Sequence, residues 1–202
     1  MPTLLVFLKY PTPGKVKTRL AAHLGDQPAA DLYREWIVLV LRQIQPLRQH
    51  ARIVGFFDGA TRDAFEPWNS LVDDWWPQPA GDLGHRLCAG FQDAHCNGGP
   101  VAALGTDCLE VDAPLINAAF DILKDKDAVF GPALDGGYYL VGTARHLPGF
   151  FTGIPWSSSK TLDAHFSHCR RNGWSVGLLP TRRDIDTRED WLQHCADKGE
   201  RP

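Results

Sequence analysis

Short apolar runs that alternate with longer segments of helical periodicity constrain this fold more than any other feature of the sequence. The first run, Thr3–Lys9, reads TLLVFLK, which is typical of a strand covered on both faces. Similar runs predict strands over 52–57, 71–76, 101–104, 128–130, 138–141 and 174–179. Helical patterns cover 28–45, 81–96, 114–124, 157–171 and 187–196, with a further helix from Val16 and a short one over 61–66 that Pro67 should end.

Strands that alternate with helices predict an α/β protein with a mainly parallel sheet. The two strands after Ala128 follow each other closely, which predicts a mixed edge to that sheet. A chain of 202 residues fits one domain over 1–202.

The charge balance excludes one broad class of partner. Lys and Arg number 21 against 24 Asp and Glu, a net charge of −3, so the chain is not a generally basic nucleic-acid binder. No apolar stretch approaches the ~20 residues of a membrane helix. The 5 cysteines form no C-x-x-C pair and the start does not resemble a signal peptide, so we expect free thiols in the cytoplasm. The sequence sets no oligomeric state.

Three polar clusters follow predicted strands, after Lys9, Leu104 and Leu179. Ligands of open α/β sheets lie beyond the carboxyl ends of the strands. These clusters are therefore the first candidates for a binding site.

The first cluster, PGKVKTR, contains Gly14, Lys15, Lys17, Thr18 and Arg19. Glycine permits close backbone approach, and Lys and Arg form charge-assisted bonds to phosphate. Cations are unfavourable at a helix start, which favours a bound anion over a merely solvated turn. The cluster lacks the Walker A pattern, and no G-x-G occurs in the chain.

Carboxylates stand out in the second and third clusters. Asp107 at the end of a strand is well placed to hold Mg²⁺ against a diphosphate, although capping of the next element is the alternative. Asp184 and Asp186 can share one face of an extended segment, so Asp186 is either a second metal ligand or a turn residue. Thr187 and Asp190 have the spacing of a helix N-cap motif.

Two glycine-rich stretches complete the candidates. Asp135, Gly136 and Gly137 precede two tyrosines, which suggests a loop against a ligand, with a plain strand connection as the alternative. Asp82 belongs to GDLGHR and is either part of the binding site or the cap of the next helix.

Taken together, these clusters resemble one known family. FLKYPTPGKVKTRLA, GDLGHRL, LGTDC, GPALDGGYYLVG, IPWSSSKTL and RDIDTREDW occur in this order between Leu4 and Trp191. They are similar to radical-SAM/selenodomain-associated transferase 1, a glycosyltransferase-like family related to phospholactate guanylyltransferase and molybdenum-cofactor guanylyltransferase.

The resemblance implies a nucleotide-diphospho-sugar transferase fold of the GT-A type, a three-layer α/β/α sandwich. It implies that the nucleotide lies on Gly14, Lys15, Lys17 and Arg19. It further implies that Asp107 and Asp186 hold the metal, and that a loop formed by Asp135, Gly136 and Gly137 borders the acceptor.

Three functions compete. The favoured one is a glycosyltransferase that uses a nucleotide-diphospho-sugar and Mg²⁺ or Mn²⁺. The metal on Asp107 and the cations Lys15, Lys17 and Arg19 would stabilise the leaving diphosphate, and Asp135 would be the base for a small-molecule acceptor. The second is a nucleotidyltransferase that joins an NMP from an NTP to a small phosphorylated acceptor and releases pyrophosphate. The third is a nucleotide-binding module without catalysis. A phosphorylated acceptor requires a second basic pocket, for which Arg86 and Lys160 are candidates, whereas a sugar acceptor requires a groove with aromatic walls.

Overall fold

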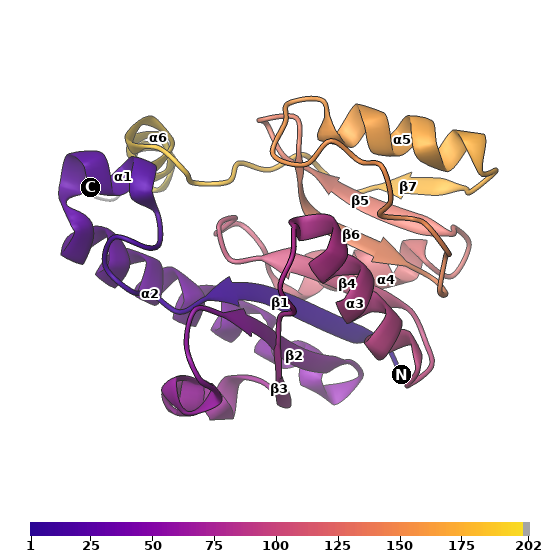
Figure 1. The fold of residues 1–202 in the computed structure, drawn as a ribbon, viewed down its shortest axis with the longest axis horizontal. Coiled ribbons are helices and arrows are strands. Elements are labelled where there is room, and N and C mark those ends of the chain that lie inside the picture. The colour runs from indigo at the N-terminus through magenta and orange to yellow at the C-terminus, as the bar shows by residue number, and fades with distance from the viewer. Residues whose placement is uncertain (200–202) are drawn as a thin grey trace.

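The structure is a computed structural model that describes residues 1–199, and its centre is one seven-stranded mixed sheet (Figure 1). The strand order is β3-β2-β1-β4-β6-β5-β7. The strands are β1 (Thr3–Lys9), β2 (Arg52–Asp58), β3 (Asp74–Pro77), β4 (Val101–Gly105), β5 (Ala128–Pro132), β6 (Tyr138–Thr143) and β7 (Val176–Leu178).

Helices cover both faces of this sheet. They are α1 (Thr18–Leu24), α2 (Asp26–Ile44), α3 (Leu83–His95), α4 (Ala113–Ile122), α5 (Thr161–Arg171) and α6 (Arg188–Lys198), with 3₁₀ segments η1 (Gln45–Gln49) and η2 (Arg62–Leu71). Alternate residues of β1 enter different cores: Leu4 packs with side chains of α2 and α4, and Leu5 with side chains of α3. The predicted three-layer α/β/α architecture is therefore confirmed.

One strand runs against the others. β6 is antiparallel to both β4 and β5, whereas β1 is parallel to β2 and β4, β2 to β3, and β5 to β7. The predicted mixed edge is confirmed. The other six strands therefore place their carboxyl ends at one edge of the sheet, and the turn that leads into β6 lies at the same edge.

Two local expectations were wrong. Pro67 does not end the short helix, since η2 continues to Leu71 with Phe65 and Trp68 buried on either side of the proline. Packing of these two rings holds a segment that lacks one backbone donor.

The helix predicted from Ser157 begins instead at Thr161. The Thr161 hydroxyl donates to the carbonyls of Pro155 and Ser158 at 2.7 Å, which holds the preceding residues in a turn. Within residues 1–199, no helix combines the length and the apolar character that crossing a bilayer requires.

Candidate functional site

The three polar clusters meet at the carboxyl edge of the sheet. The segment after β7 runs back across this edge to α6, as the yellow trace of Figure 1 shows. The Ile185 N–H donates to the Asp107 carbonyl at 2.9 Å, which joins the cluster after β7 to the cluster after β4. Lys17, from the loop after β1, reaches both.

Lys17 is the central cation of this junction. Its Nζ lies 2.7 Å from Asp107 Oδ1 and 2.9 Å from Asp186 Oδ1, and it donates to the Ile185 carbonyl at 2.5 Å. An ammonium group has three N–H donors, so these contacts use all of them. In this arrangement Lys17 holds the two predicted metal ligands together, and its predicted contact with phosphate stays a prediction.

The backbone of Lys17 is unusual as well. It is the N-cap of α1 with φ 45° and ψ 43°, a left-handed conformation that is rare outside glycine. The Lys17 side chain is 5% exposed, and its ammonium lies 5.4 Å from the centre of the Trp36 ring. Burial lowers the pKa of this ammonium, but the Asp107 and Asp186 carboxylates outweigh it and raise the pKa above its ordinary value.

A cationic cavity of about 300 Å³ opens beside this junction. Its lining residues are Lys9, Lys15, Val16, Lys17, Thr18, Arg19, Tyr33, Asp107 and Asp186. Because Lys9, Lys15 and Arg19 are exposed, their charges are available to an anion. Gly14 lies in the same loop with φ 73°, which a residue with a side chain would adopt only under strain.

Tyr33, a buried residue of α2, lines this cavity. Its hydroxyl lies 2.9 Å from Thr106 Oγ1 and accepts a hydrogen bond from the Lys9 N–H at 3.3 Å. Burial, with the Asp107 carboxylate nearby, raises the pKa of Tyr33 to about 12, so the phenol stays protonated. Tyr33 and Lys9 were not among the residues predicted from the sequence, although the position of Lys9 at the end of the first strand is a usable signal.

A second cavity of about 560 Å³ adjoins the first and is acidic. Its lining residues are Arg19, Leu83, Asp107, Asp135, Gly137, Tyr138, Trp156, Ser157, Ser158, Ser159, Thr161, Asp184 and Asp186. Arg19, Asp107 and Asp186 line both cavities. The two spaces therefore form one site with a cationic end and an acidic end.

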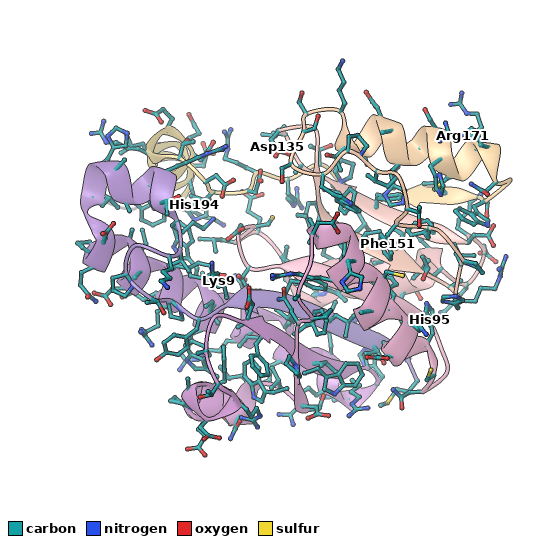
Figure 2. All side chains as sticks on the ribbon, viewed as in Figure 1. Lys9, His95, Asp135, Phe151, Arg171 and His194 are labelled. Carbon is teal, nitrogen blue, oxygen red and sulfur yellow. The ribbon has the colours of Figure 1, made fainter. Side chains whose placement is uncertain are left out.

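The carboxylates at the acidic end lie close enough to repel one another. Burial, with the carboxylates of Asp135, Asp186 and Asp107 nearby, raises the pKa of Asp184 to about 6. Asp135 Oδ1 accepts the Gly137 N–H at 2.8 Å, which fixes the turn before β6. Figure 2 shows Asp135 above the sheet edge and Lys9 below it, at the end of β1. A cation or several hydroxyl donors would relieve this repulsion.

Several candidate residues have a clear structural role. Asp82 is the N-cap of α3 and accepts the His85 N–H at 2.8 Å. Gly136 packs against the chain at Ser159, since a Cβ on Gly136 would lie 2.1 Å from the Ser159 carbonyl oxygen. Thr187 and Asp190 form the predicted capping box at the start of α6, which is confirmed.

The proposed second basic pocket does not form at the acidic end. The Arg86 guanidinium donates to Asp58 at 2.8 Å and to Gln78 at 2.9 Å. Lys160 is exposed at the N-cap of α5. Across residues 1–199, neither side chain is among those that line the acidic cavity.

Residues 40–158 match the family described as "Uncharacterized protein conserved in bacteria (DUF2064)". The chain belongs to the DUF2064 family. None of the curated proteins matches it.

The crystal structure of a candidate nucleotide-diphospho-sugar transferase from Desulfovibrio desulfuricans G20 is 33% identical to this DUF2064 chain. The match covers 98% of this chain and 87% of the other, with a TM-score of 0.88. By this similarity over nearly its whole length, the chain belongs with the transferases.

Two more distant structures share the fold. A nucleotidyl transferase from Methanothermobacter is 15% identical, covering 98% of this chain and 97% of that one, with a TM-score of 0.69. The 4-diphosphocytidyl-2C-methyl-D-erythritol synthase from Anaerococcus prevotii is 9% identical, covering 99% of each chain, with a TM-score of 0.66. The predicted nucleotide-diphospho-sugar transferase fold is confirmed.

Proposed function

We propose that this DUF2064 protein is a divalent-metal-dependent glycosyltransferase that uses a nucleotide-diphospho-sugar. The observation that carries the proposal is the joining of a cationic cavity to an acidic, aromatic-walled cavity through Arg19, Asp107 and Asp186. A nucleotide-sugar has the matching polarity, since its diphosphate is anionic and its sugar is rich in hydroxyl groups. The resemblance of its motifs to those of the radical-SAM/selenodomain-associated transferases supports the same proposal.

The cationic end would hold the diphosphate. Lys15 in the loop after β1 and Arg19 in the first turn of α1 are exposed and can donate charge-assisted hydrogen bonds to phosphate oxygens. These bonds would strengthen as the diphosphate leaves and gains negative charge. Lys17 would contribute indirectly, because it holds the Asp107 and Asp186 carboxylates in place beside the diphosphate.

The acidic end fits a divalent cation by its donor chemistry. Mg²⁺ is commonly held by one or two carboxylates together with the phosphates of its substrate. Within residues 1–199, no three His, Cys, Asp or Glu side chains converge as a ready-made metal site. We therefore propose that Asp107 and Asp186 hold Mg²⁺ or Mn²⁺ only together with the nucleotide. When bound, the metal would neutralise charge on the leaving diphosphate.

In the proposed reaction, an acceptor hydroxyl oxygen bonds to the anomeric carbon of the sugar. The bond from that carbon to the diphosphate oxygen breaks, and the nucleoside diphosphate leaves. Asp135 lines the acidic cavity with an exposed carboxylate, so it can take the proton from the acceptor hydroxyl. A phosphorylated acceptor is disfavoured, because carboxylates line this cavity and Arg86 and Lys160 do not.

Nucleotidyl transfer is the second candidate. Two structural neighbours are named as a nucleotidyl transferase and a diphosphocytidyl compound synthase. The cation density around Lys9, Lys15, Lys17 and Arg19 also suits a triphosphate. In this reaction, the nucleophilic group of the acceptor would have to bind beside the four carboxylates of the acidic cavity despite their negative charge.

A thermal-shift panel separates the candidates. Nucleoside triphosphates, diphosphates and diphospho-sugars are each tested with and without Mg²⁺ or Mn²⁺, because a ligand of the native state raises its melting temperature. A metal-dependent shift that is larger for one diphospho-sugar than for its parent diphosphate supports glycosyl transfer. A shift with a triphosphate and none with diphospho-sugars would favour nucleotidyl transfer. No shift with any nucleotide would reject both reactions.

A further inference from the structure

Trp156 forms one wall of the acidic cavity, and the absence of a side chain at Gly84 sets its position. A Cβ on Gly84 would lie 2.4 Å from Trp156 Nε1 and 2.9 Å from Cε2. The indole thus rests directly on the backbone of the first turn of α3. Real Cβ atoms do not approach other atoms this closely, so an alanine at position 84 would move the indole.

The loop that bears Trp156 is fixed from several sides. Ser157, the next residue, has φ 55°, a strained left-handed conformation for a non-glycine residue. Thr161 is 6% exposed, and its hydroxyl donates to the Pro155 carbonyl on the other side of Trp156. The Leu162 N–H donates to the Gly136 carbonyl at 3.0 Å, which joins α5 to the turn before β6.

Neighbouring rings fix the orientation of the indole. The Tyr138 ring meets it edge-on, with the ring centres 6.4 Å apart and the planes at 81°. His165, which is fully buried, meets it at 6.4 Å and 90°. The Phe151 ring lies 6.4 Å away at 39°. Strain in the loop and contact with these three rings together describe a preorganised platform rather than a surface side chain.

The platform and the carboxylates together define a ligand class. An aromatic face next to hydrogen-bond acceptors suits a sugar ring, whose C–H groups form an apolar face and whose hydroxyls are donors. Asp135 and Asp184 accept hydrogen bonds and repel anions, with Arg19 as the cation among the residues that line this cavity.

We infer that the acidic cavity binds a sugar ring without phosphate or carboxylate groups, seated on Trp156, and that Gly84 sets the height of this platform. The inference rests on the proposed function for the identity of the site, but it concerns the ring alone. Trp156 is a specificity-determining residue in this arrangement, and Gly84 is a positioning residue.

Saturation-transfer NMR on the full chain tests the inference. The probes are glucose, galactose, mannose and N-acetylglucosamine, each compared with its 6-phosphate, in the presence of Mg²⁺ and the nucleotide identified by thermal shift, or UDP if none is identified. Irradiation of aromatic protons should transfer magnetisation to ring C–H protons of at least one neutral sugar. Trp156→Ala and Gly84→Ala should each weaken binding of that sugar about tenfold, as loss of a central aromatic contact does.

Gly90→Ala is the matched control, because it makes the same change in the same helix. A Cβ at Gly90 would meet Leu5 and Phe56 in the core, at 3.0 and 3.3 Å, and not the cavity. This variant should lose stability while its affinity for the sugar is retained. Trp156→Phe keeps a flat ring and should retain part of the binding.

Three results would overturn the inference. They are preferential binding of a 6-phosphate, unchanged neutral-sugar binding in both Trp156→Ala and Gly84→Ala, and no binding of any neutral sugar. The proposed glycosyl transfer is judged separately by the nucleotide panel on the wild-type chain. Trp156→Ala should leave the shift given by the parent diphosphate unchanged, because Trp156 does not line the cationic cavity. A nucleotidyltransferase with a sugar acceptor would satisfy the NMR test and fail the diphospho-sugar test.

Discussion

Replacing Lys17 with methionine removes the cation that joins the loop after β1 to the clusters after β4 and β7. The side chain is 5% exposed, and its partners Asp107 and Asp186 are 44% and 47% exposed. Removing one partner of a fully buried ion pair costs about 3–5 kcal/mol, whereas exposed pairs contribute about 0–1 kcal/mol. Since water screens the carboxylates here, we expect a loss of about 2 kcal/mol.

Methionine retains the left-handed strain of position 17, so the loss reports the charge and not the backbone. Urea unfolding near neutral pH is the assay. For a slope of about 2–3 kcal/mol per molar urea, the midpoint should fall by about 0.7–1 M. Lys15→Met removes an exposed cation from the same loop and should change the midpoint little.

A double-mutant cycle with Asp186→Asn then isolates the pair. The doubly substituted chain should lose less stability than the sum of the single losses, because each substitution removes the same contact. Equal midpoints for Lys17→Met and Lys15→Met would refute the reasoning. That result would mean that the Lys17 contacts do not hold the segment after β7 in solution.

Asp107→Asn should abolish metal-dependent turnover while urea unfolding stays cooperative; wild-type activity that still requires metal would remove Asp107 from the site. Lys15→Met combined with Arg19→Met should weaken nucleotide binding in calorimetry by at least about tenfold, since two charge-assisted contacts are lost, and unchanged affinity would place the phosphates elsewhere. The raised pKa of Asp184 favours the folded state when this carboxyl is protonated, and this contribution is lost as pH rises through about 6. After allowance for solvent screening, the charged Asp184 should cost about 1 kcal/mol of stability at pH 8. Asp184→Asn should therefore melt about 2–4 °C above the wild type at pH 8, and the two proteins should melt together near pH 4. A melting difference that is the same at all pH values would contradict this origin. Asp82→Ala should cost about 1 kcal/mol by loss of the α3 cap and leave nucleotide affinity unchanged, whereas weakened binding would return Asp82 to the site.

Much of the fold could be predicted because the core strands carry their own signal. The run Thr3–Lys9 is β1 without any shift, and its apolar side chains enter both cores. The boundaries that failed depend on tertiary contacts. The hydroxyl of Thr161 holds residues 157–160 out of α5, and the burial of Phe65 and Trp68 carries η2 past Pro67. Such contacts leave no periodic pattern in the sequence.

The site was predictable where residues follow strands and unpredictable where helices and loops supply side chains. Lys17, Asp107 and Asp186 follow β1, β4 and β7, and the structure brings them together. Tyr33 lies on the buried face of α2 and lines the cationic cavity. The apolar pattern of that helix does not indicate which of its buried residues lines a cavity. The position of Trp156 depends on the left-handed backbone of Ser157, and a serine in the sequence does not predict that conformation.

The segment after β7 determines at what stage of synthesis and folding the site can form. Lys17 and Asp186 are 169 positions apart, so their contact is among the most non-local that a chain of 202 residues permits. Contacts of this kind form late in folding, because a large loop must close first. During synthesis, the chain through Asp186 would have to leave the ribosome before Lys17 meets this carboxylate. Chains that lack the segment after β7 therefore lack Asp186 and cannot form this contact.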